Sequence, residues 1–575
     1  MTRVLPGVYV EFHDYSMLPE GETNLAVGYV LASPRGPIGK AELVTSPADF
    51  LSKFTLTGSP TIKDDKTFWS ILQVLKYTNE VYISRAAKNV LYGGLSVTAN
   101  ACTPWETGME NPENFDFDVE AQQATEAQGT EGQEGYIPAQ EAVAGTTDIL
   151  FTLAGIDGGK YNNDLGIEII SYKDKPEQLV DYFEDTNAMT AAQPFIIRVY
   201  DMTNETEPAQ LEEFMVSLLP EAKAFDGSVM YIDTVLKGSA YIQVTLPTDG
   251  RAGAPSSTTG KVKMAGGTNE DVANLTYTDA LKALEVFEDK TVPISLMGNG
   301  TGVMYENADY QQGLIELSKK RQDFLAFLNS REQDEKATAN STKAINIVDY
   351  KKGKNEGGLG STYWGACMYA PHVNYSDVFN SRKIKLGADS TAIAGWLSVI
   401  LGQGYPFAYA GPQDGLVSGV TTDWKIGDLS GEALKLNDAS INYVAYDAKV
   451  GRYYMQCQNT LQIANSSLRN IGAVLNILDI KQTFITYFKE YLQKPITPRL
   501  REEIWTKGND YLKDRILGMN RCINYSFVDA TTDLDLADNT LRYILTIALT
   551  PYAQKIYLYM NIVNANYDFS IAQGN

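Results

Sequence analysis

Residues 5–16, LPGVYVEFHDYS, alternate between two sets of side chains with the period of a β-strand. One set is apolar and the other is more polar: Val8, Val10 and Phe12 against Tyr9, Glu11 and His13. A Pro-Gly pair precedes the pattern, and the segment LPEGETN (18–24) follows it. Residues that typically end a strand therefore flank the pattern on both sides. A single strand bounded by turn residues cannot pair its own backbone N–H and C=O groups, so a partner strand must come from outside this segment.

Residues 24–90 and 266–400 alternate between helix and strand periods. The first segment has the pattern strand, helix, strand, at 24–33, 64–78 and 80–87. The second has helical periodicity at 276–289, a buried strand at 291–298, and a further helix with the start of a strand within 307–328. These patterns predict a βαβ unit in the first segment and a doubly wound α/β sheet in the second.

Two other segments differ from this alternation. Residues 148–265 contain short strand patterns separated by Gly, Asn and Asp turns, which predict a β-sandwich, with a loop at 247–261. The C-terminal part predicts an α+β arrangement, with helices at 466–493 and 497–519 followed by strands at 523–531, 541–551 and 555–563.

Composition narrows the class of partner. The chain of 575 residues is too long for one core, and its net charge of −23 argues against a nucleic-acid partner, which needs clustered Lys and Arg. No Lys or Arg occurs between Lys88 and Lys160. The acidic stretch 120–135 has few residues that could fill a core, so it is predicted to be a solvent-exposed surface loop. The 35 tyrosines favour either large, partly wet interfaces or a tyrosine-rich β surface.

The sequence predicts neither an export signal nor a membrane span. The N-terminal residues MTRVLPGVYV contain no apolar signal core, and no apolar run approaches ~18 residues. We therefore expect synthesis in a cytoplasm, with retention there or exit by a route other than ordinary secretion.

Candidate chemistry is sparse. Of two histidines, His372 lies in the segment YAPHVNYS and is interpreted as a polar loop residue without a Ser and Asp context. The four cysteines form no CxxC pair, which argues against a zinc site or a disulfide framework. There is no P-loop motif, and Glu113, Asp116 and Asp118 lack the spacing of an EF-hand. We predict no catalytic residue, metal site or cofactor.

Several stretches, taken in order, resemble the tail sheath proteins of contractile-tailed bacteriophages and related injection machines. They are PGVYVEF near the start, GPIGKAELVTSPADFLSKF (36–54), VLKYTNEVYISRAA (74–87), and the segments 265–300, 404–420, 454–478, 511–533 and 541–562. The resemblance covers most of the chain except about 95–150. Where many sheaths have Trp-Gly-Ala-Arg-Thr, residues 456–460 are Gln-Cys-Gln-Asn-Thr, and Arg469 is single where many have paired arginines.

The resemblance implies a multidomain α+β and α/β fold. N-terminal and C-terminal α+β regions would form the sheath core, a β-sandwich would be inserted, and the central doubly wound domain would be similar to subtilisin without its catalytic residues. The expected domains are an arm at 1–22, an N-terminal α/β domain at 23–94, the insert at 95–265, the central domain at 266–440 and the C-terminal domain at 441–575.

The resemblance also implies a structural function without enzymatic activity or a cofactor. Copies of the chain would form stacked rings of a helical sheath around a tail tube protein, next to baseplate and tail terminator proteins, and contraction would drive the tube through the host envelope. The sheath would belong to the virion after assembly in the host cytoplasm, without nucleic-acid contact or membrane insertion. The alternatives are the sheath of a headless injection particle and, from another class, a degenerate subtilisin-like hydrolase.

Two sets of site residues follow from the resemblance. In sheaths, an N-terminal arm and a C-terminal extension add strands to neighbouring subunits by β-augmentation. The expected strand residues are Val8, Tyr9, Val10, Glu11, Phe12, Ile556, Leu558, Met560 and Ile562. The closing domain would face the tube, and its cationic residues are the expected contacts: Lys494, Arg499, Arg501, Lys507, Lys513 and Arg515.

Overall fold

The computed structural model describes residues 26–55, 58, 60, 65–117, 148–248, 253–354 and 357–552. These residues form two compact units. The larger unit contains the described residues up to 464 together with 468–486, and the smaller unit contains 465–467 and 487–552. The predicted arm, 1–22, and the predicted last strand, 555–563, lie outside the described residues.

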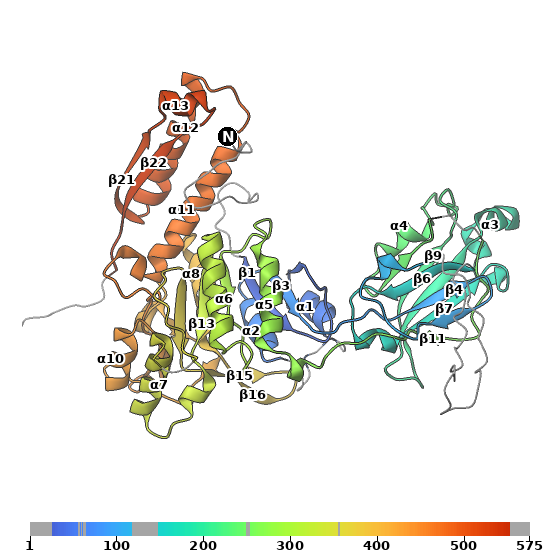
Figure 1. Ribbon diagram of the computed structural model, residues 1–575, viewed down its shortest axis with the longest axis horizontal. Helices are drawn as coiled ribbons and strands as arrows, with labels where there is room; N and C mark the ends of the chain where they lie inside the picture. The colour runs from blue at the N-terminus through green and yellow to red at the C-terminus, as the bar shows by residue number, and fades with distance from the viewer. Residues whose placement is uncertain are drawn as a thin grey trace, which may run out of the picture. The chain divides into compact units, whose positions relative to one another are not determined.

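A nine-stranded sheet forms the centre of the larger unit, in the order β17-β20-β19-β14-β13-β12-β1-β3-β2 (Figure 1). Its strands are β1 (Val27–Ala32), β2 (Ala41–Val44), β3 (Val81–Ala86), β12 (Leu296–Gly298), β13 (Leu325–Asn329), β14 (Ala366–Ala370), β17 (Leu416–Val417), β19 (Asn442–Asp447) and β20 (Arg452–Met455). The strands from β19 to β3 pair in parallel, and the outer pairings of β2, β17 and β20 are antiparallel. Parallel strands are covered on both faces, and β1 is accordingly buried along its whole length.

Helices pack on both faces of this sheet. On one face, α2 (Thr67–Val74), α8 (Ala388–Gln403), α1 (Pro47–Phe54) and the first part of α11 (Ile471–Lys489) form a core that includes Trp69 and Trp396. On the other face, α5 (Tyr277–Glu285), α6 (Ala308–Arg321), α7 (Asn340–Lys352) and α10 (Gly431–Asp438) form a second core. The prediction of a mixed α/β, multidomain protein is confirmed.

The strand β1 pairs with β12 as well as with β3, in the register Val27↔Leu296. The predicted N-terminal domain, 23–94, and the predicted central domain, 266–440, therefore share one sheet, and the boundary between them is wrong. The boundary at 440/441 is also wrong, because β19, β20 and residues 468–486 belong to the larger unit. Periodicity indicates that a strand exists, but it does not identify a partner far along the chain.

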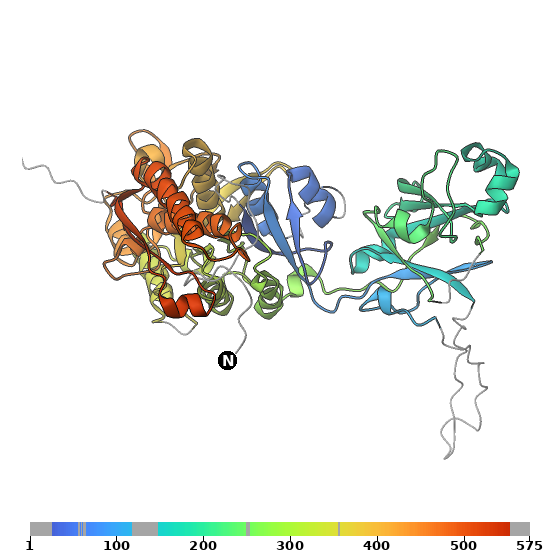
Figure 2. The same ribbon diagram turned by 90° about the horizontal axis from the view of Figure 1, so that it is seen from above.

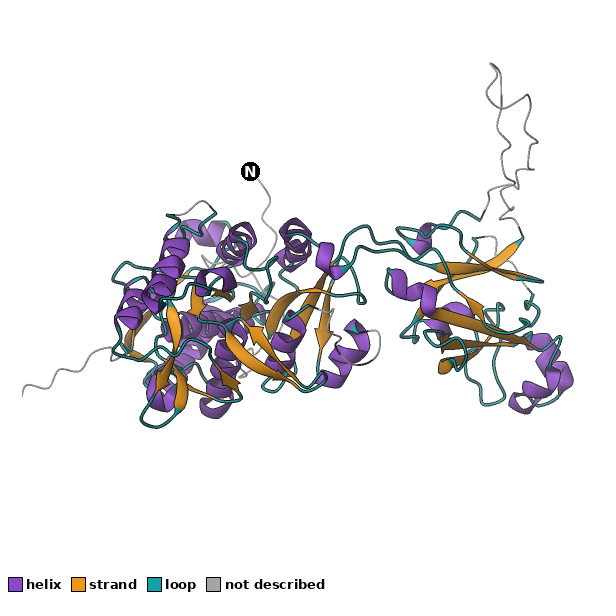
Figure 3. Ribbon diagram, turned by 90° about the horizontal axis from the view of Figure 1, so that it is seen from below, coloured by secondary structure: helices purple, strands orange, loops and turns teal. Residues whose placement is uncertain are grey.

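The insert between β3 and α5 contains two four-stranded antiparallel sheets (Figure 2, Figure 3). One has the order β10-β6-β4-β5, from β4 (Gly94–Thr98), β5 (Cys102–Pro104), β6 (Ile149–Gly155) and β10 (Ile242–Thr245). The other has the order β11-β7-β8-β9, from β7 (Leu165–Ser171), β8 (Phe195–Asp201), β9 (Ala209–Val216) and β11 (Val262–Lys263). Phe151 and Phe195, from different sheets, stack with ring centroids 5.8 Å apart, as in the core of the predicted sandwich.

Arg85, at the end of β3, connects the insert to the nine-stranded sheet. Its guanidinium, 2% exposed, donates to four backbone carbonyls, those of Ser33 at 3.0 Å, Pro34 at 2.9 Å, Gly36 at 2.8 Å and Gly158 at 2.7 Å. Gly158 belongs to the insert, and the other three residues follow β1. Because a guanidinium has five N–H donors in a rigid fork, one side chain fixes both segments.

Candidate functional site

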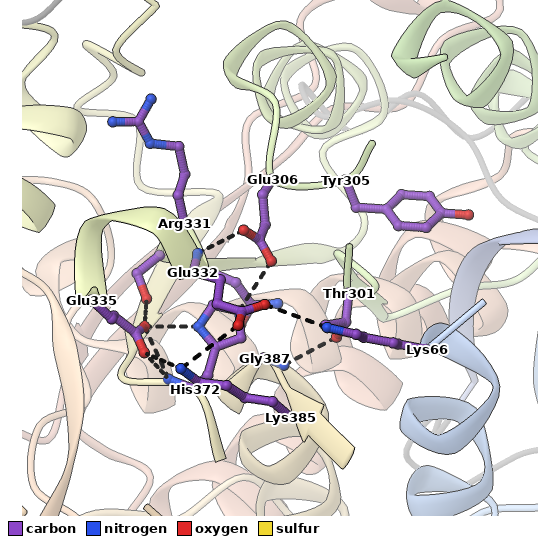
Figure 4. Close-up of polar contacts among 12 residues, drawn as sticks. Lys66, Thr301, Tyr305, Glu306, Arg331, Glu332, Glu335, His372, Lys385 and Gly387 are labelled. Carbon is purple, nitrogen blue, oxygen red and sulfur yellow. Dashed lines mark hydrogen bonds and ion pairs between the residues drawn. The ribbon is translucent and has the colours of Figure 1, made fainter. Parts of the chain in front are cut away.

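A charged cluster surrounds His372, which follows β14 (Figure 4). The imidazole is buried, with Nδ1 2.7 Å from Glu335 Oε1 and Nε2 3.1 Å from Glu306 Oε1. Burial by itself lowers the pKa of His372, but the charges and hydrogen bonds of Glu335 and Glu306 raise it to about 10. The ring is therefore an imidazolium at neutral pH, with both nitrogens bonded to carboxylates.

Two lysines extend this cluster. Lys385 Nζ lies 3.7 Å from Glu335 and 3.9 Å from Glu332, and Lys66 Nζ lies 3.4 Å from Glu332 (Figure 4). The backbone N–H of Glu332 donates to Glu306 Oε2 at 2.6 Å. The cluster therefore joins segments that are far apart in the sequence into one charge-balanced network.

The interpretation of His372 as a polar loop residue is wrong, because the side chain is buried and ion-paired. The hydroxyl of Ser330 donates to Glu335 at 2.8 Å and not to the imidazole. A nucleophile–base pair needs a ring nitrogen that can accept a serine proton, and both nitrogens of His372 are occupied by carboxylates. The cluster thus has the geometry of a structural ion network. The apolar neighbours of His372 in the sequence, Tyr369, Ala370 and Val373, were the available signal for its burial.

Within the described residues there is neither a metal-binding group nor a membrane-spanning helix. No group of three or more His, Cys, Asp or Glu side chains in this part of the chain is placed to hold a metal ion. Within the same residues, no helix combines the length and the apolarity needed to cross a membrane.

The smaller unit contains a β-hairpin covered by a helix. The strands β21 (Cys522–Asp529) and β22 (Tyr543–Leu549) are antiparallel, and α12 (Pro498–Tyr511) continues into a π-helical turn, Leu512–Leu517 (Figure 1, Figure 2). The side chain of Thr497 caps α12 by accepting the N–H of Leu500 at 3.1 Å, with Pro498 at the first helical position. A short helix, α13 (Asp533–Ala537), lies between the strands in the sequence.

One face of the hairpin packs on the helices of the smaller unit. Phe527 is buried, and its ring stacks on Tyr543 with centroids 5.5 Å apart. Tyr543 also contacts Phe488, at 5.8 Å. The indole N–H of Trp505, on α12, donates to the carbonyl of Phe527 at 2.9 Å. These contacts stabilise a two-stranded sheet, which by itself is marginally stable in water.

In the described part of the chain, the other face and the edges of the hairpin are not covered. Ile523 is 62% exposed, Val528 is 50% exposed and Ile544 is 51% exposed. Among the described residues, β21 and β22 pair only with each other, so the outer edge of the sheet lacks a third strand. An apolar strand face next to an open edge is a template for pairing with another chain. The sequence pattern located both strands, but the exposure of Ile523, Val528 and Ile544 could not be read from it.

The structure separates the six predicted tube-facing cations into two groups. Arg501 Nε bonds to Asp529 at 2.7 Å, and Lys507 Nζ bonds to Glu490 at 2.6 Å. Burial opposes ionisation of Asp529, but hydrogen bonds from Arg501 and Thr531 lower its pKa. The remaining four are exposed: Lys494, Arg499, Lys513 and Arg515. The predicted set therefore combines two internal ion pairs with four surface charges.

The charge of the smaller unit differs from that of the rest of the chain. Residues 487–552 contain nine Lys and Arg against nine Asp and Glu, so the net charge of −23 is carried by other parts of the sequence. The predicted strand residues Val8–Phe12 and Ile556–Ile562 lie outside the described residues, and their pairing stays a prediction.

The chain matches no protein-family model and no curated protein. A sheath tail protein from Listeria innocua is similar in structure, with a TM-score of 0.50 at 10% identity, over 93% of this chain and 96% of the other. A sheath tail protein from Desulfitobacterium hafniense has a TM-score of 0.45 at 10% identity, over 95% and 100% of the two chains. The contracted sheath of an extracellular contractile injection system has a TM-score of 0.40 at 13% identity, over 50% and 75%.

The similarity to the Listeria innocua protein extends over nearly the full length of both chains, although few residues are identical. It includes both the units described above, because 93% of this chain is aligned. The chain therefore has the mixed α/β, multidomain fold of the sheath tail proteins.

Proposed function

We propose that this protein is the structural subunit of a contractile tail sheath, which assembles helically around a tail tube and shortens to drive the tube through a host cell envelope. The fold supports this function, since the structures of similar architecture are sheath tail proteins. The observation that carries the proposal is the hairpin β21–β22, which pairs with no third strand among the described residues and exposes Ile523, Val528 and Ile544.

Assembly would proceed by strand addition at this hairpin. The segments around Val8–Phe12 and Ile556–Ile562 alternate as strands in the sequence. Donated to neighbouring copies, these strands would complete the open edges and cover the exposed apolar face. Each contact joins two different surfaces of the chain, and such heterologous contacts build open helices.

The tube protein would contact the smaller unit. Lys494, Arg499, Lys513 and Arg515 are exposed there, in a unit whose Lys and Arg are as numerous as its Asp and Glu, unlike the acidic rest of the chain. Exposed ion pairs contribute only ~0–1 kcal/mol each and are screened by salt, so they suit a contact that must release during contraction. Baseplate and tail terminator proteins are the further partners, and the sheath would belong to a virion assembled in the host cytoplasm.

The central α/β part would have the subtilisin-like fold without catalytic function. The charge network around His372 supports a structural role, because both ring nitrogens are bonded to carboxylates and no serine faces them in the described residues. We therefore favour a sheath over a degenerate hydrolase. The sheath of a headless injection particle would assemble through the same contacts. Capsid genes next to the gene for this chain would distinguish a phage tail sheath from such a particle.

The test is electron microscopy of the purified full-length chain, alone and with its tube protein. We expect tubes or rings of helical order from the chain alone, and longer sheaths of smaller diameter on tubes. A chain that remains a compact monomer at every concentration and salt, with and without tubes, would overturn the proposed function.

A further inference from the structure

Three cations, Lys351, Lys352 and Arg469, lie at the C-terminal end of α7, the helix labelled in Figure 1. Lys351 and Lys352 are the last residues of the helix. Lys351 is 1% exposed, and its Nζ donates to the carbonyl of Leu461 at 3.1 Å. The carbonyl of Arg469 accepts the N–H of Thr460, the residue before Leu461, at 2.8 Å. Lys351 and Arg469 therefore bond to two consecutive residues, Leu461 and Thr460.

The cations of this cluster are not paired with a carboxylate of the described residues. Within the part of the chain that the structure describes, Lys351, Lys352 and Arg469 form no ion pair with a carboxylate. Burial together with the positive charges of Lys352 and Arg469 lowers the pKa of Lys351 to about 8.

Buried cations of the larger unit bond either to a carboxylate or, like Arg85 and Lys481, to backbone carbonyls. The buried Arg321 bonds to Asp323 at 2.6 Å, and Lys354, two residues beyond α7, lies 3.3 Å from Asp349. Lys351 belongs to the second kind, and the two cations beside it, Lys352 and Arg469, also have no carboxylate partner among the described residues, although buried charges in proteins are normally paired.

Buried polar atoms within residues 456–470 also have no hydrogen-bond partner among the described residues. Residues Asn459 and Asn470 form a β-bridge, and around them four buried polar atoms have no hydrogen bond: Gln456 Oε1, Gln458 Oε1, Arg469 Nε and Asn470 Nδ2. Asn470 is 7% exposed. The glutamine amides can present N–H groups instead of oxygens by rotation, and buried donors normally have an acceptor.

We propose that Lys351, Lys352, Arg469 and Asn470 form a site that receives an Asp or Glu carboxylate from a second copy of this chain. Lys352 is exposed and Arg469 is half-buried, so a carboxylate can approach these two cations from the surface, whereas Lys351 is buried. We expect the carboxylate to come from a second copy of the chain. The chain has a net charge of −23, and this excess of Asp and Glu belongs to residues outside the smaller unit. This inference rests on the proposed function, since it assigns one contact of the sheath lattice.

The first test reverses the accessible charges in the full-length chain, with the double variant Lys352→Glu and Arg469→Glu. The control is Lys354→Glu, which changes an exposed cation near the same helix end that is already paired with Asp349. We expect the double variant to raise the critical concentration for tube formation by at least about tenfold, which corresponds to ~1.4 kcal/mol per contact, while the control changes it little.

A second variant separates assembly from folding. Lys351→Met removes the buried cation and keeps an apolar side chain of similar length, and replacing a buried charge in this way is often neutral or stabilising. We expect a monomer with an unchanged or higher melting temperature that assembles poorly. A lower melting temperature would show that Lys351 serves the fold of the monomer, and would overturn the proposal whatever happens to assembly.

The remaining outcomes are also decisive. Normal tubes from the double variant, at the concentration that suffices for the wild type, would overturn the carboxylate site and leave the proposed function standing. Normal assembly of the variant combined with stabilisation of the wild-type monomer by sulfate would mean that the site binds a free inorganic anion, which also overturns it. A wild-type chain that forms no tubes would instead refute the proposed function.

Discussion

Replacing His372 by glutamine tests whether the buried imidazolium stabilises the larger unit. The ring contacts Glu335 at 2.7 Å and Glu306 at 3.1 Å, and all three side chains are buried. Removing one member of a buried ion network leaves the remaining charges uncompensated, which costs roughly 3–5 kcal/mol. We expect His372→Gln to lower the free energy of unfolding of the larger unit by about this amount in mildly acidic solution.

The size of the effect depends on pH in a defined direction. The pKa of His372 is about 10 in the folded protein against 6.5 for an ordinary histidine, as in the unfolded chain. Below pH 6.5 both states bind the proton, so the stabilisation is fully present. Between pH 6.5 and about 10 only the folded state binds it, so the stabilisation falls by ~1.4 kcal/mol per pH unit and is lost as pH rises through the folded pKa.

Urea denaturation followed by tryptophan fluorescence measures this difference, because Trp69 and Trp396 are in the core of the larger unit. Wild type and variant are compared at about pH 6, 7.5 and 9, so that groups titrating in both proteins cancel. Lys66→Gln is the control, since its pair with Glu332 is partly exposed and should contribute only ~0–1 kcal/mol at each pH. A difference between wild type and His372→Gln that stays constant over this range would refute the assignment of a buried imidazolium.

Three further predictions concern assembly. Removal of residues 1–20 should leave a folded monomer that forms no ordered sheath, and regular tubes of the truncated chain in negative-stain images would show that the arm is dispensable. Replacement of 120–135 by a short Gly/Ser linker should preserve assembly and contraction, because this acidic stretch has few core residues; a folded variant that cannot assemble would contradict this. Reversal of Arg499, Lys513 and Arg515 to Glu should abolish extended sheaths on tubes while contracted, tubeless sheaths still form, and normal extended sheaths at both low and high salt would exclude these contacts.

Local periodicity located most of the strands, because the side chains of each strand alternate whatever the strand pairs with. The strands β3, β8 and β22 fall inside the segments whose patterns predicted them. The helix predicted at 497–519 also exists, although its last part is a π-helical turn from Leu512 to Leu517. The strand predicted at 291–298 is shorter, since β12 begins only at Leu296 after Pro293, which has no N–H to donate to a ladder.

Long-range pairing could not be predicted in the same way. The sheet forms only when β1 pairs with β12, and nothing in either strand specifies the other. The network of His372 depends on Glu306 and Glu335, which are separated from it in the sequence and reach it through the sheet. A histidine inside a mostly apolar run suggests burial, but its charge state follows from partners that only the fold brings together.

The two units differ in how their backbone hydrogen bonds are completed, and this difference is the physical basis of the proposed assembly. In the larger unit, the parallel strands from β19 to β3 each pair on both sides. In the described part of the smaller unit, β21 and β22 pair only with each other, and one of their faces is exposed. Strands added from neighbouring copies would complete the hairpin without disturbing the sheet of the larger unit. A lattice joined in this way can keep its connections while the larger units rotate as rigid bodies, so contraction would require no exchange of strands.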